Sequence, residues 1–476
     1  MEYFQKKKSF TKTDIDIYSF IISKDDKQNI KYIEKLLDIK IPTTLLEDNE
    51  VQKKLYTNCF EVYFTESNPL EKKKLFINYG SLGVTMSTYT KKKIFIYMNS
   101  ENENDLKNQI ISYILGYFNF KILNTEIKKN YAVNITYFYH PKKEFRKIIN
   151  DAIYTAIVQN EVRELINLPA NILYSTTYLS YIKNNLPNNI TLHVLDKEKL
   201  QENEFNLTLS VNRASSNPPL IIVLEYNYQT NENDKSICLI GKGVMFDTGG
   251  YNIKLEDFSN MKMDMAGSAV MYGVLKLLSH NKVKGKYIGI LPIVQNMING
   301  SAYLPGDVIT AYNKKTIEII NTDAEGRLIL AEGLSYSKKF NPKLCIDIGT
   351  LTEPAMSIFN GLATVVIGNT NKYIQEIIKE GDINFERVWQ LPLWEEYIEL
   401  TKSEIADLKN LSFNLLGADT VMCAAFLSNF VPKNTDWIHL DIAREVIPVV
   451  KSNYRQYGAS GEMVRTIFSF LYKIST

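Results

Sequence analysis

The sequence predicts an α/β protein whose larger part is built on a central, largely parallel sheet flanked by helices. Three observations predict it. Short apolar strand candidates alternate with helix candidates from about residue 220 onward, which is typical of parallel sheets covered on both faces. The length of 476 residues exceeds one ordinary hydrophobic core, so two domains are expected. Hydrophobic residues make up 45% of the chain, as in globular proteins.

Residues 1–150 are expected to form the N-terminal domain. Phe60–Phe64 and Lys93–Met98 are strand candidates, and Asp105–Tyr117 has the pattern of an amphipathic helix. No metal-ligand spacing occurs in this region. A long helix with a broad apolar stripe is predicted over Phe145–Ile166, and it should end at Asn167–Pro169 because proline cannot continue a helix. This places a linker helix at 151–170 and the larger domain at 171–476.

The larger domain alternates strands and helices. Its strand candidates are short apolar segments: Leu220–Leu224, Ser236–Ile240, Tyr287–Pro292, Leu344–Ile348 and Ala363–Ile367. Its helix candidates follow or separate them: Met261–Leu278, Glu325–Lys338 and Thr420–Phe430. No internal repeat occurs at a fixed period.

An octapeptide with two carboxylates and a guanidinium stands at a predicted strand-to-helix transition. Asn321–Leu328 has the sequence N-T-D-A-E-G-R-L, after a strand candidate at Lys315–Ile320. Active groups are commonly placed at such transitions in α/β proteins. The pair Asp323 and Glu325 suits metal chemistry, although an Asp before a helix is more often only an N-cap.

More charged residues gather about seventy residues upstream. Gly241–Gly250 has the sequence G-K-G-V-M-F-D-T-G-G, directly after a strand candidate, and Met261–Gly267 has the sequence M-K-M-D-M-A-G. The glycines are expected to let the backbone bend around ligands. Crowded carboxylates need cations, and oxygen-rich sites suit pairs of divalent ions about 3.5–4 Å apart. The spacing does not match a phosphate-binding loop.

These motifs together resemble the leucyl (cytosol) aminopeptidases, which are two-metal hexameric exopeptidases. The resemblance runs from Asn167 nearly to the C-terminus, in the right order, through the following segments: Asn167–Asn171, Pro305–Val308, Asn321–Leu328, Leu391–Tyr397, Ala406–Asn410, His439–Ala443 and Gly458–Arg465. It implies an enzyme that releases N-terminal amino acids from short peptides. It also implies that residues 1–150 are a smaller N-terminal α/β domain that precedes the larger catalytic domain.

The resemblance assigns ligands to two divalent ions, Zn or Mn, with Mg or Co as alternatives in the looser site. The tighter ion would take Lys242, Asp247, Asp264 and Glu325. The looser ion would take Asp247, Asp323 and Glu325, so two carboxylates would bridge. An ammonium has no lone pair, so the pKa of Lys242, ordinarily about 10.4, must fall before it can ligate; otherwise this lysine only neutralises its neighbours.

The resemblance also assigns catalytic roles. Lys254 would stabilise the oxyanion that develops during hydrolysis. Arg327, with its planar fork, would hold a bicarbonate that acts as general base. Backbone groups of Ala324, Gly326 and Leu351 would complete the bicarbonate cradle.

The substrate pocket is where this chain departs from the family pattern. Its implied lining residues are Met261, Thr350, Glu353, Ala443 and Val446. Glu353 and Arg444 both replace glycine, and Gln295 stands where the family usually has Glu. Glu353 either faces the pocket and favours Lys or Arg substrates or pairs with Arg444. Pairing is favoured, so Leu and Met are expected as N-terminal residues, with bulky aromatic ones disfavoured.

Charge and cysteine usage bound the remaining functions. The chain has 55 basic and 53 acidic residues and a net charge of +2, so no nucleic-acid footprint is present. Four scattered cysteines and no long apolar run predict a cytoplasmic protein without a membrane segment. A homohexamer is implied by the resemblance. The alternatives are a catalytically silent structural or regulatory hexamer and a two-metal hydrolase of another ester, and the intact set of expected ligands argues against the former.

Overall fold

The structure is a computed structural model that describes residues 4–6, 17–23, 54–57, 60–65, 72–87, 93–98, 100–120, 135–140, 142–231, 233–256, 258–412, 418–443 and 458–475. The chain divides into two compact units, and the division falls between Asn160 and Glu161, within helix α6 (Arg146–Asn167). Each unit has its own sheet.

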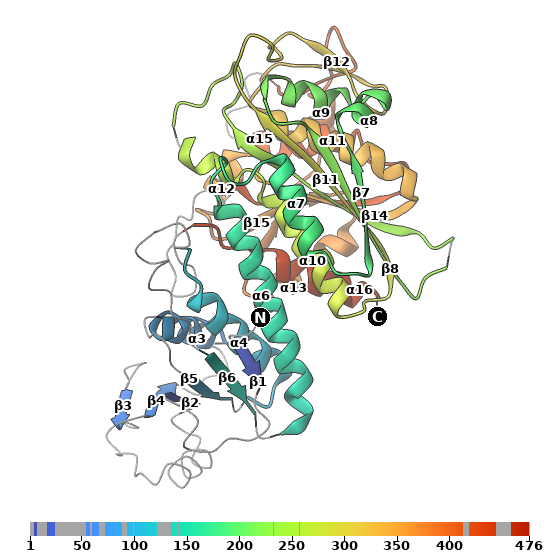
Figure 1. The fold of residues 1–476 in the computed structure, drawn as a ribbon. Helices are drawn as coiled ribbons and strands as arrows, with labels where there is room; N and C mark the ends of the chain where they lie inside the picture. Colours follow the sequence, from blue (N-terminus) through green and yellow to red (C-terminus); the bar gives the residue numbers. More distant parts are fainter. Residues whose placement is uncertain are drawn as a thin grey trace. The chain divides into compact units, whose positions relative to one another are not determined.

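The N-terminal unit contains a six-stranded sheet in the order β1-β6-β5-β2-β4-β3 (Figure 1). Its strands are β1 (Phe4–Lys6), β2 (Ile17–Ser23), β3 (Lys54–Thr57), β4 (Phe60–Thr65), β5 (Lys93–Tyr97) and β6 (Ile135–Tyr139). Helices α3 (Lys72–Ser87) and α4 (Glu103–Tyr117) pack against each other, and Gly83 and Gly116 allow the close approach, because a Cβ at either would lie 2.0 Å from a backbone oxygen of the other helix. The strands expected at Phe60–Phe64 and Lys93–Met98 and the helix at Asp105–Tyr117 are confirmed.

The second unit is built on a nine-stranded, mostly parallel sheet with the order β16-β15-β18-β14-β9-β11-β8-β7, with β10 beside β11. Its strands are β7 (Ile190–Leu195), β8 (Leu220–Tyr228), β9 (Ser236–Gly241), β10 (Gly243–Asp247), β11 (Gly285–Asn296), β14 (Pro342–Gly349), β15 (Thr364–Gly368), β16 (Val388–Gln390) and β18 (Asp436–Asp441). The inner pairs β18-β14, β14-β9 and β9-β11 are parallel, while β7, β8 and the β15-β18 pair are antiparallel. The predicted fold class is confirmed.

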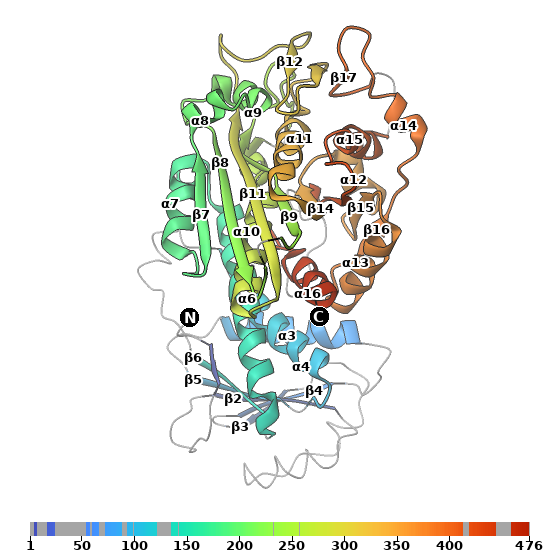
Figure 2. The same ribbon diagram turned by 90° about the vertical axis from the view of Figure 1, so that its right-hand side faces the viewer.

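Two buried helices cover opposite faces of this sheet. Helix α10 (Ala266–His280) covers the face of β11 to which Gly289 belongs, because a Cβ added to Gly289 would meet Leu275 of that helix. Helix α11 (Glu325–Ser337) covers the other face, because its Gly333 lies against Ile290, the next residue of β11. Neighbouring residues of a strand point to opposite faces. Figure 2 shows α11 and α15 (Asp419–Ser428) on one side of β11, and α16 (Val464–Ser475) packs against α10. Both faces of the sheet are therefore covered, and its central strands β9 and β11 are mostly apolar and buried.

Shorter elements complete the second unit. They are α7 (Ser175–Asn185), α8 (Lys197–Glu202), α9 (Asn206–Val211), α12 (Glu353–Ile358), α13 (Asn371–Ile383) and α14 (Glu395–Glu399). A separate three-stranded sheet contains β12 (Val308–Thr310), β13 (Thr316–Glu318) and β17 (Leu408–Lys409). In the described part of the chain, no helix combines the length and apolar character needed to cross a bilayer.

Two local expectations need correction. The helix predicted from Met261 begins only at Ala266, because Phe258–Met263 forms a 3₁₀ turn. The strand expected before the acidic octapeptide is confirmed as β13, which belongs to the small sheet. Gly243–Asp247 is a strand and not a bend: Gly243 packs where a Cβ would lie 2.5 Å from Ile293 Cδ1, so glycine serves close packing there.

Candidate metal centre

The first carboxylate stands at the end of β10. Asp247 is buried, and its Oδ1 accepts hydrogen bonds from Gly249 N at 2.9 Å and Asn296 Nδ2 at 2.8 Å. Gly249 has a φ of +86°, and a Cβ there would lie 2.3 Å from the Asn252 carbonyl oxygen, so this turn requires glycine. The strand end and the turn together aim one carboxylate out of the sheet edge.

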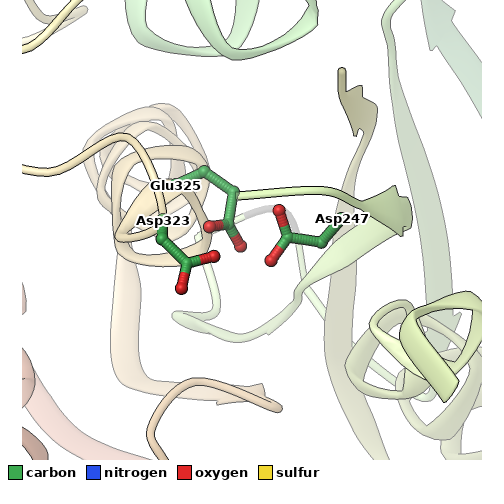
Figure 3. A group of neighbouring side chains, drawn as sticks. All are labelled: Asp247, Asp323 and Glu325. Atoms are coloured by element: carbon green, nitrogen blue, oxygen red, sulfur yellow. The ribbon is translucent and has the colours of Figure 1, made fainter. Parts of the chain in front are cut away.

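The second and third carboxylates come from the turn that leads into α11. Asn321 Oδ1 accepts the Asp323 backbone N–H at 2.7 Å, and Glu325 is the first residue of the helix. One oxygen each of Asp247, Asp323 and Glu325 lie within 4.8 Å of one another. Figure 3 shows the three carboxylates pointing toward a common centre, with Asp247 opposite the other two. The sequence segments separated by about seventy residues thus meet as expected.

Asp264 and Lys242 form the deeper part of the cluster. Lys242 Nζ lies 2.7 Å from Asp264 Oδ1 and 3.1 Å from Glu325 Oε1, and it donates to the Thr350 carbonyl oxygen at 2.6 Å. Helix α10 approaches the sheet closely enough to place Asp264 there, because a Cβ on Gly267 would lie 2.3 Å from the Ile348 carbonyl oxygen. Lys242 therefore holds two carboxylates in the absence of other cations.

Crowding and burial raise the pKa values of three of the carboxyl groups. Burial, followed by the neighbouring charges of Asp247 and Glu325, raises the pKa of Asp323 to about 8. The pKa of Glu325 is raised by burial and by Asp247, and burial raises the pKa of Asp264 well above its usual range despite Lys242. Like charges this close oppose full ionisation. The positive charge available in the cluster is therefore too small to keep all of these carboxyl groups ionised.

The pKa values of the two lysines are raised as well, and for a lysine a raised pKa favours the charged form. Burial alone would lower the pKa of Lys242, but Asp264 and Glu325 outweigh burial and hold it above its ordinary value. The pKa of Lys254 is raised for the same reason, since its Nζ lies 2.9 Å from Asp247 Oδ2 and 2.5 Å from Asp323 Oδ1. Without an added cation both are ammonium ions. Ligation through Lys242 requires that a dication displace its proton.

The donor set fits divalent cations. Two buried oxygens, Asp264 Oδ2 and Glu325 Oε2, have no hydrogen-bond partner among the described residues. Buried carboxylate oxygens are normally satisfied, and an orphan pair in one cluster points to an absent ligand. Carboxylate oxygens suit hard or borderline divalent ions such as Mg²⁺, Mn²⁺ and Zn²⁺.

Arg327 lies one helical turn into α11 and is already engaged on two sides. Its Nη2 is 2.8 Å from Asp419 Oδ1, and its Nη1 donates to the Asn410 carbonyl oxygen at 2.9 Å. Gly326 brings the helix against its neighbours, since a Cβ there would lie 2.4 Å from Lys242 Cε and 2.6 Å from Leu351 Cδ2. Ala324 is buried beside it. The expected bicarbonate-binding residues are thus adjacent, although the Leu351 N–H already donates to Asp441 Oδ1 at 3.2 Å.

The expected substrate-pocket residues are only partly described. Thr350 is buried and its Oγ1 donates to Asp264 Oδ1 at 2.7 Å, so it contacts the cluster itself. Met261 is half-buried in the 3₁₀ turn before Asp264, and Ala443 follows β18. Glu353 is exposed at the start of α12. Val446 and Arg444 lie outside the described residues.

Sequence reasoning missed several residues that shape the site. Asn296 donates to both Asp247 and the Thr322 carbonyl oxygen, and Tyr303 donates to that same carbonyl at 2.7 Å. Asn410 accepts the Ile320 N–H at 2.8 Å and donates to the Asn321 carbonyl at 2.7 Å, which holds the acidic turn. Gln295, a departure from the family pattern, bonds Ser215 and Asn217 instead of the carboxylates. Only the position of Asn410 in the A-D-L-K-N segment could have signalled its role.

Residues 160–468 match the family model described as "Cytosol aminopeptidase family, catalytic domain". This stretch covers more than half of the chain and includes every carboxylate of the cluster. The chain belongs to the cytosol aminopeptidase family. It is accordingly a metal-dependent aminopeptidase, a hydrolase that acts on peptides.

Individual relatives agree with this assignment. A probable cytosol aminopeptidase of Phytoplasma mali is 34% identical, with 82% of this chain and 80% of the relative covered. One of Clostridium perfringens is 30% identical, with 98% and 94% covered. The crystal structure of the cytosol aminopeptidase from Coxiella burnetii superposes with a TM-score of 0.80 at 25% identity, covering 99% of each chain. The bottromycin maturation enzyme BotP in complex with Mn shares the fold, with a TM-score of 0.83 at 21% identity over 97% of this chain and all of that one.

Proposed function

We propose that this aminopeptidase removes N-terminal amino acids from short peptides with two divalent cations bound at the cluster of Asp247, Asp264, Asp323, Glu325 and Lys242. The single observation that carries the proposal is the convergence of three carboxylates within 4.8 Å, in a cluster where Asp264 Oδ2 and Glu325 Oε2 have no hydrogen-bond partner among the described residues. By the family pattern, Asp247 and Glu325 would contribute ligand oxygens to both ions. The ions would be Zn²⁺ or Mn²⁺, with Mg²⁺ or Co²⁺ as alternatives in the looser site.

When bound, the cations supply Lewis-acid polarisation, a nucleophile at neutral pH and a partner for the free α-amine. Lys254 supplies the protein's own positive charge at the rim of the cluster. Its ammonium group is 21% exposed and bridges Asp247 and Asp323. A fixed ammonium there stabilises negative charge that develops on the scissile carbonyl oxygen.

Arg327 and Gly326 would hold a bicarbonate as general base. The Arg327 fork keeps donors beyond those that bond Asp419 and Asn410. Gly326 lacks a side chain at the point where α11 meets Lys242 and Leu351. Backbone groups of Ala324 and Leu351 would complete this site, with the Leu351 N–H shared with Asp441.

We further propose that the pocket for the N-terminal side chain prefers Leu and Met. Met261, Thr350, Ala443 and Val446 would line it, and Glu353 would pair with Arg444 and leave the pocket neutral but narrow. An unpaired carboxylate in a small apolar pocket costs several kcal/mol unless it protonates or finds a cation, which favours pairing. Comparing kcat/KM for Leu, Met, Phe, Lys and Arg substrates in wild type and Glu353→Gly tests it: a wild-type preference for Lys or Arg that is absent in the variant contradicts the pairing.

A homohexamer in the cytoplasm is the assembly and location that we propose from the family. Symmetric homo-oligomers are the common case for soluble enzymes. Mass measurement in solution at micromolar concentration should give six chains, and a monomer contradicts the assembly.

The reaction itself is tested with aminoacyl amides and the metal-stripped protein reconstituted with Zn²⁺, Mn²⁺, Mg²⁺ or Co²⁺. Release of the N-terminal amino acid should depend on added metal. Acetylation of the substrate α-amine should abolish it, because the proposal requires a free amine. Equal hydrolysis of the acetylated peptide, or of a phosphate ester instead of a peptide, contradicts the proposed function.

A further inference from the structure

Asp441 is a buried carboxylate beside the metal cluster that has no part in the proposed reaction. It is the last residue of β18 and stands in register with Gly349, the last residue of β14. Its side chain is 2% exposed. A carboxylate is costly to bury unless its oxygens are satisfied, so its partners indicate what it is for.

Among the described residues, the hydrogen-bond partners of Asp441 lie in the loop after β14 and at the end of β18. Its Oδ1 accepts the N–H groups of Leu351 at 3.2 Å and Ala443 at 3.1 Å, and its Oδ2 accepts the Thr352 hydroxyl at 2.7 Å. The Thr352 hydroxyl also lies 2.7 Å from that of Thr420 in α15. One carboxylate thus ties residues 351 and 352 to β18, and Thr352 ties the same loop to α15.

The loop that Asp441 ties down makes two contacts to the metal cluster, both through Thr350. Its carbonyl oxygen accepts from Lys242 Nζ at 2.6 Å, and its hydroxyl donates to Asp264 Oδ1 at 2.7 Å. These bonds fix the orientation of the lysine and of the carboxylate whose second oxygen has no partner among the described residues. Residue 350 is joined directly to residue 351, so its position depends on the Asp441 contacts.

We propose that Asp441 is a positioning residue that orients Lys242 and Asp264 for metal binding through the 350–352 loop. The proposal rests on the metal site described under "Proposed function". Without the carboxylate, two backbone N–H groups and the Thr352 hydroxyl lose their acceptor in a buried place, and the loop is expected to shift to satisfy them. Groups that orient metal ligands typically change metal affinity by about 10–100-fold when removed.

The test compares Asp441→Ala with Asp441→Asn by calorimetric titration of Mn²⁺ into metal-stripped protein. The asparagine oxygen can accept both N–H groups, and its amide can donate to Thr352, whose hydroxyl then donates to Thr420. Asp441→Ala should weaken Mn²⁺ binding about tenfold or more and lower kcat. Asp441→Asn should restore the Mn²⁺ affinity to within about threefold of wild type. Equal weakening in both variants shows that the charge itself matters and overturns the positioning role.

Two further variants separate positioning from general stability. Glu386→Ala removes an equally buried carboxylate that accepts the N–H groups of Met463 and Thr466, so it should lower the melting temperature but leave Mn²⁺ affinity unchanged. Thr352→Val removes one Asp441 contact without changing side-chain volume and should weaken Mn²⁺ binding measurably even if Asp441→Ala does not fold. Unchanged affinity in every folded Asp441 and Thr352 variant overturns the inference. Wild type that binds no Mn²⁺ contradicts the metal site itself and, with it, this role.

Discussion

Two buried charged regions of the second unit are built on opposite plans. Both carboxylate oxygens of Glu386 accept hydrogen bonds from within the protein. Oε2 accepts from Met463 N, Thr466 N and the Thr466 hydroxyl, and Oε1 accepts from Arg465. In the metal cluster, carboxylates face one another, the pKa values of Asp264, Asp323 and Glu325 are raised by burial and neighbouring charges, and two buried oxygens have no partner among the described residues. The Glu386 carboxylate has its hydrogen-bond donors within the protein, whereas the carboxylates of the proposed metal cluster need cations from outside the protein.

The largest difference should come from Glu325→Gln. This change removes a proposed bridging charge, so kcat is expected to fall by about 10³-fold or more, beyond the loss of a single oxyanion donor. Because it also relieves repulsion from Asp247, the metal-free variant should melt no lower than metal-free wild type. Steady-state kinetics and calorimetry measure both. A melting temperature that drops while kcat is retained would erase the contrast with Glu386.

Lys254→Ala should have the next largest effect. Loss of a group that stabilises a developing oxyanion lowers kcat by roughly 10²-fold. Bound Mn²⁺ should not decrease, since the removed ammonium competes with metal for Asp247 and Asp323. The exposed Lys379→Ala, whose Nζ lies 3.9 Å from Glu376, is the control and should match wild type. Loss of metal from Lys254→Ala would give this lysine a structural role instead.

Glu386→Gln should lower stability and leave kcat unchanged, which is the reverse of Glu325→Gln. Glutamine has only one acceptor oxygen, and its NH₂ group would face the donors of Arg465 and Thr466 in α16. The free energy of unfolding is expected to fall by about 2 kcal/mol, the scale of hydrogen bonds to a charged group. Denaturant unfolding measures this loss, and kcat should stay near wild type. A large loss of kcat with normal stability would link Glu386 to the reaction.

Glu332 is a case intermediate between Glu386 and the metal cluster. Its two oxygens accept the N–H groups of Leu207 and Thr208 at the start of α9, but burial dominates and raises its pKa to about 7. The folded state therefore holds a proton that the unfolded chain has lost above its ordinary pKa of 4.5. The stability is present at low pH and is lost as the pH rises from about 4.5 to about 7.

The expected decline is roughly 2–3 kcal/mol between pH 5 and 8. Glu332→Gln cannot titrate, so the difference in unfolding free energy between wild type and variant should change with pH in that direction. Parallel pH profiles for the two proteins would show that Glu332 is ionised throughout.

Much of the central sheet could be predicted from the sequence, because strands buried on both faces are mostly apolar. Ser236–Ile240 and, apart from Asp347, Leu344–Ile348 are such segments, and both are strands that pair in parallel. The start of α10 could not be predicted, since Met261–Met265 has helical spacing but the close contact of Gly267 with β14 sets where the helix begins. Local pattern does not report such tertiary contacts.

The same distinction applies to the site. The carboxylates could be named from the motifs because each stands at the end of a predicted element. The sequence could not show that Thr350, expected in the substrate pocket, bonds Lys242 and Asp264, or that Arg327 is engaged by Asp419 and Asn410. These partners lie between 83 and 108 residues apart along the chain, so only the tertiary structure brings them together; for Thr350 and Lys242 this is the parallel pairing of β14 with β9.

The central claim, that the cluster is incomplete without external cations, is tested most directly by removing and returning metal. Wild type is stripped with a chelator, its metal content and peptide hydrolysis are measured, and Mn²⁺ is then titrated back by calorimetry. We predict that stripped protein is inactive and that activity returns as two Mn²⁺ bind per chain. Full hydrolysis by protein that contains no metal, or restored activity without Mn²⁺ binding in wild type, would contradict the claim.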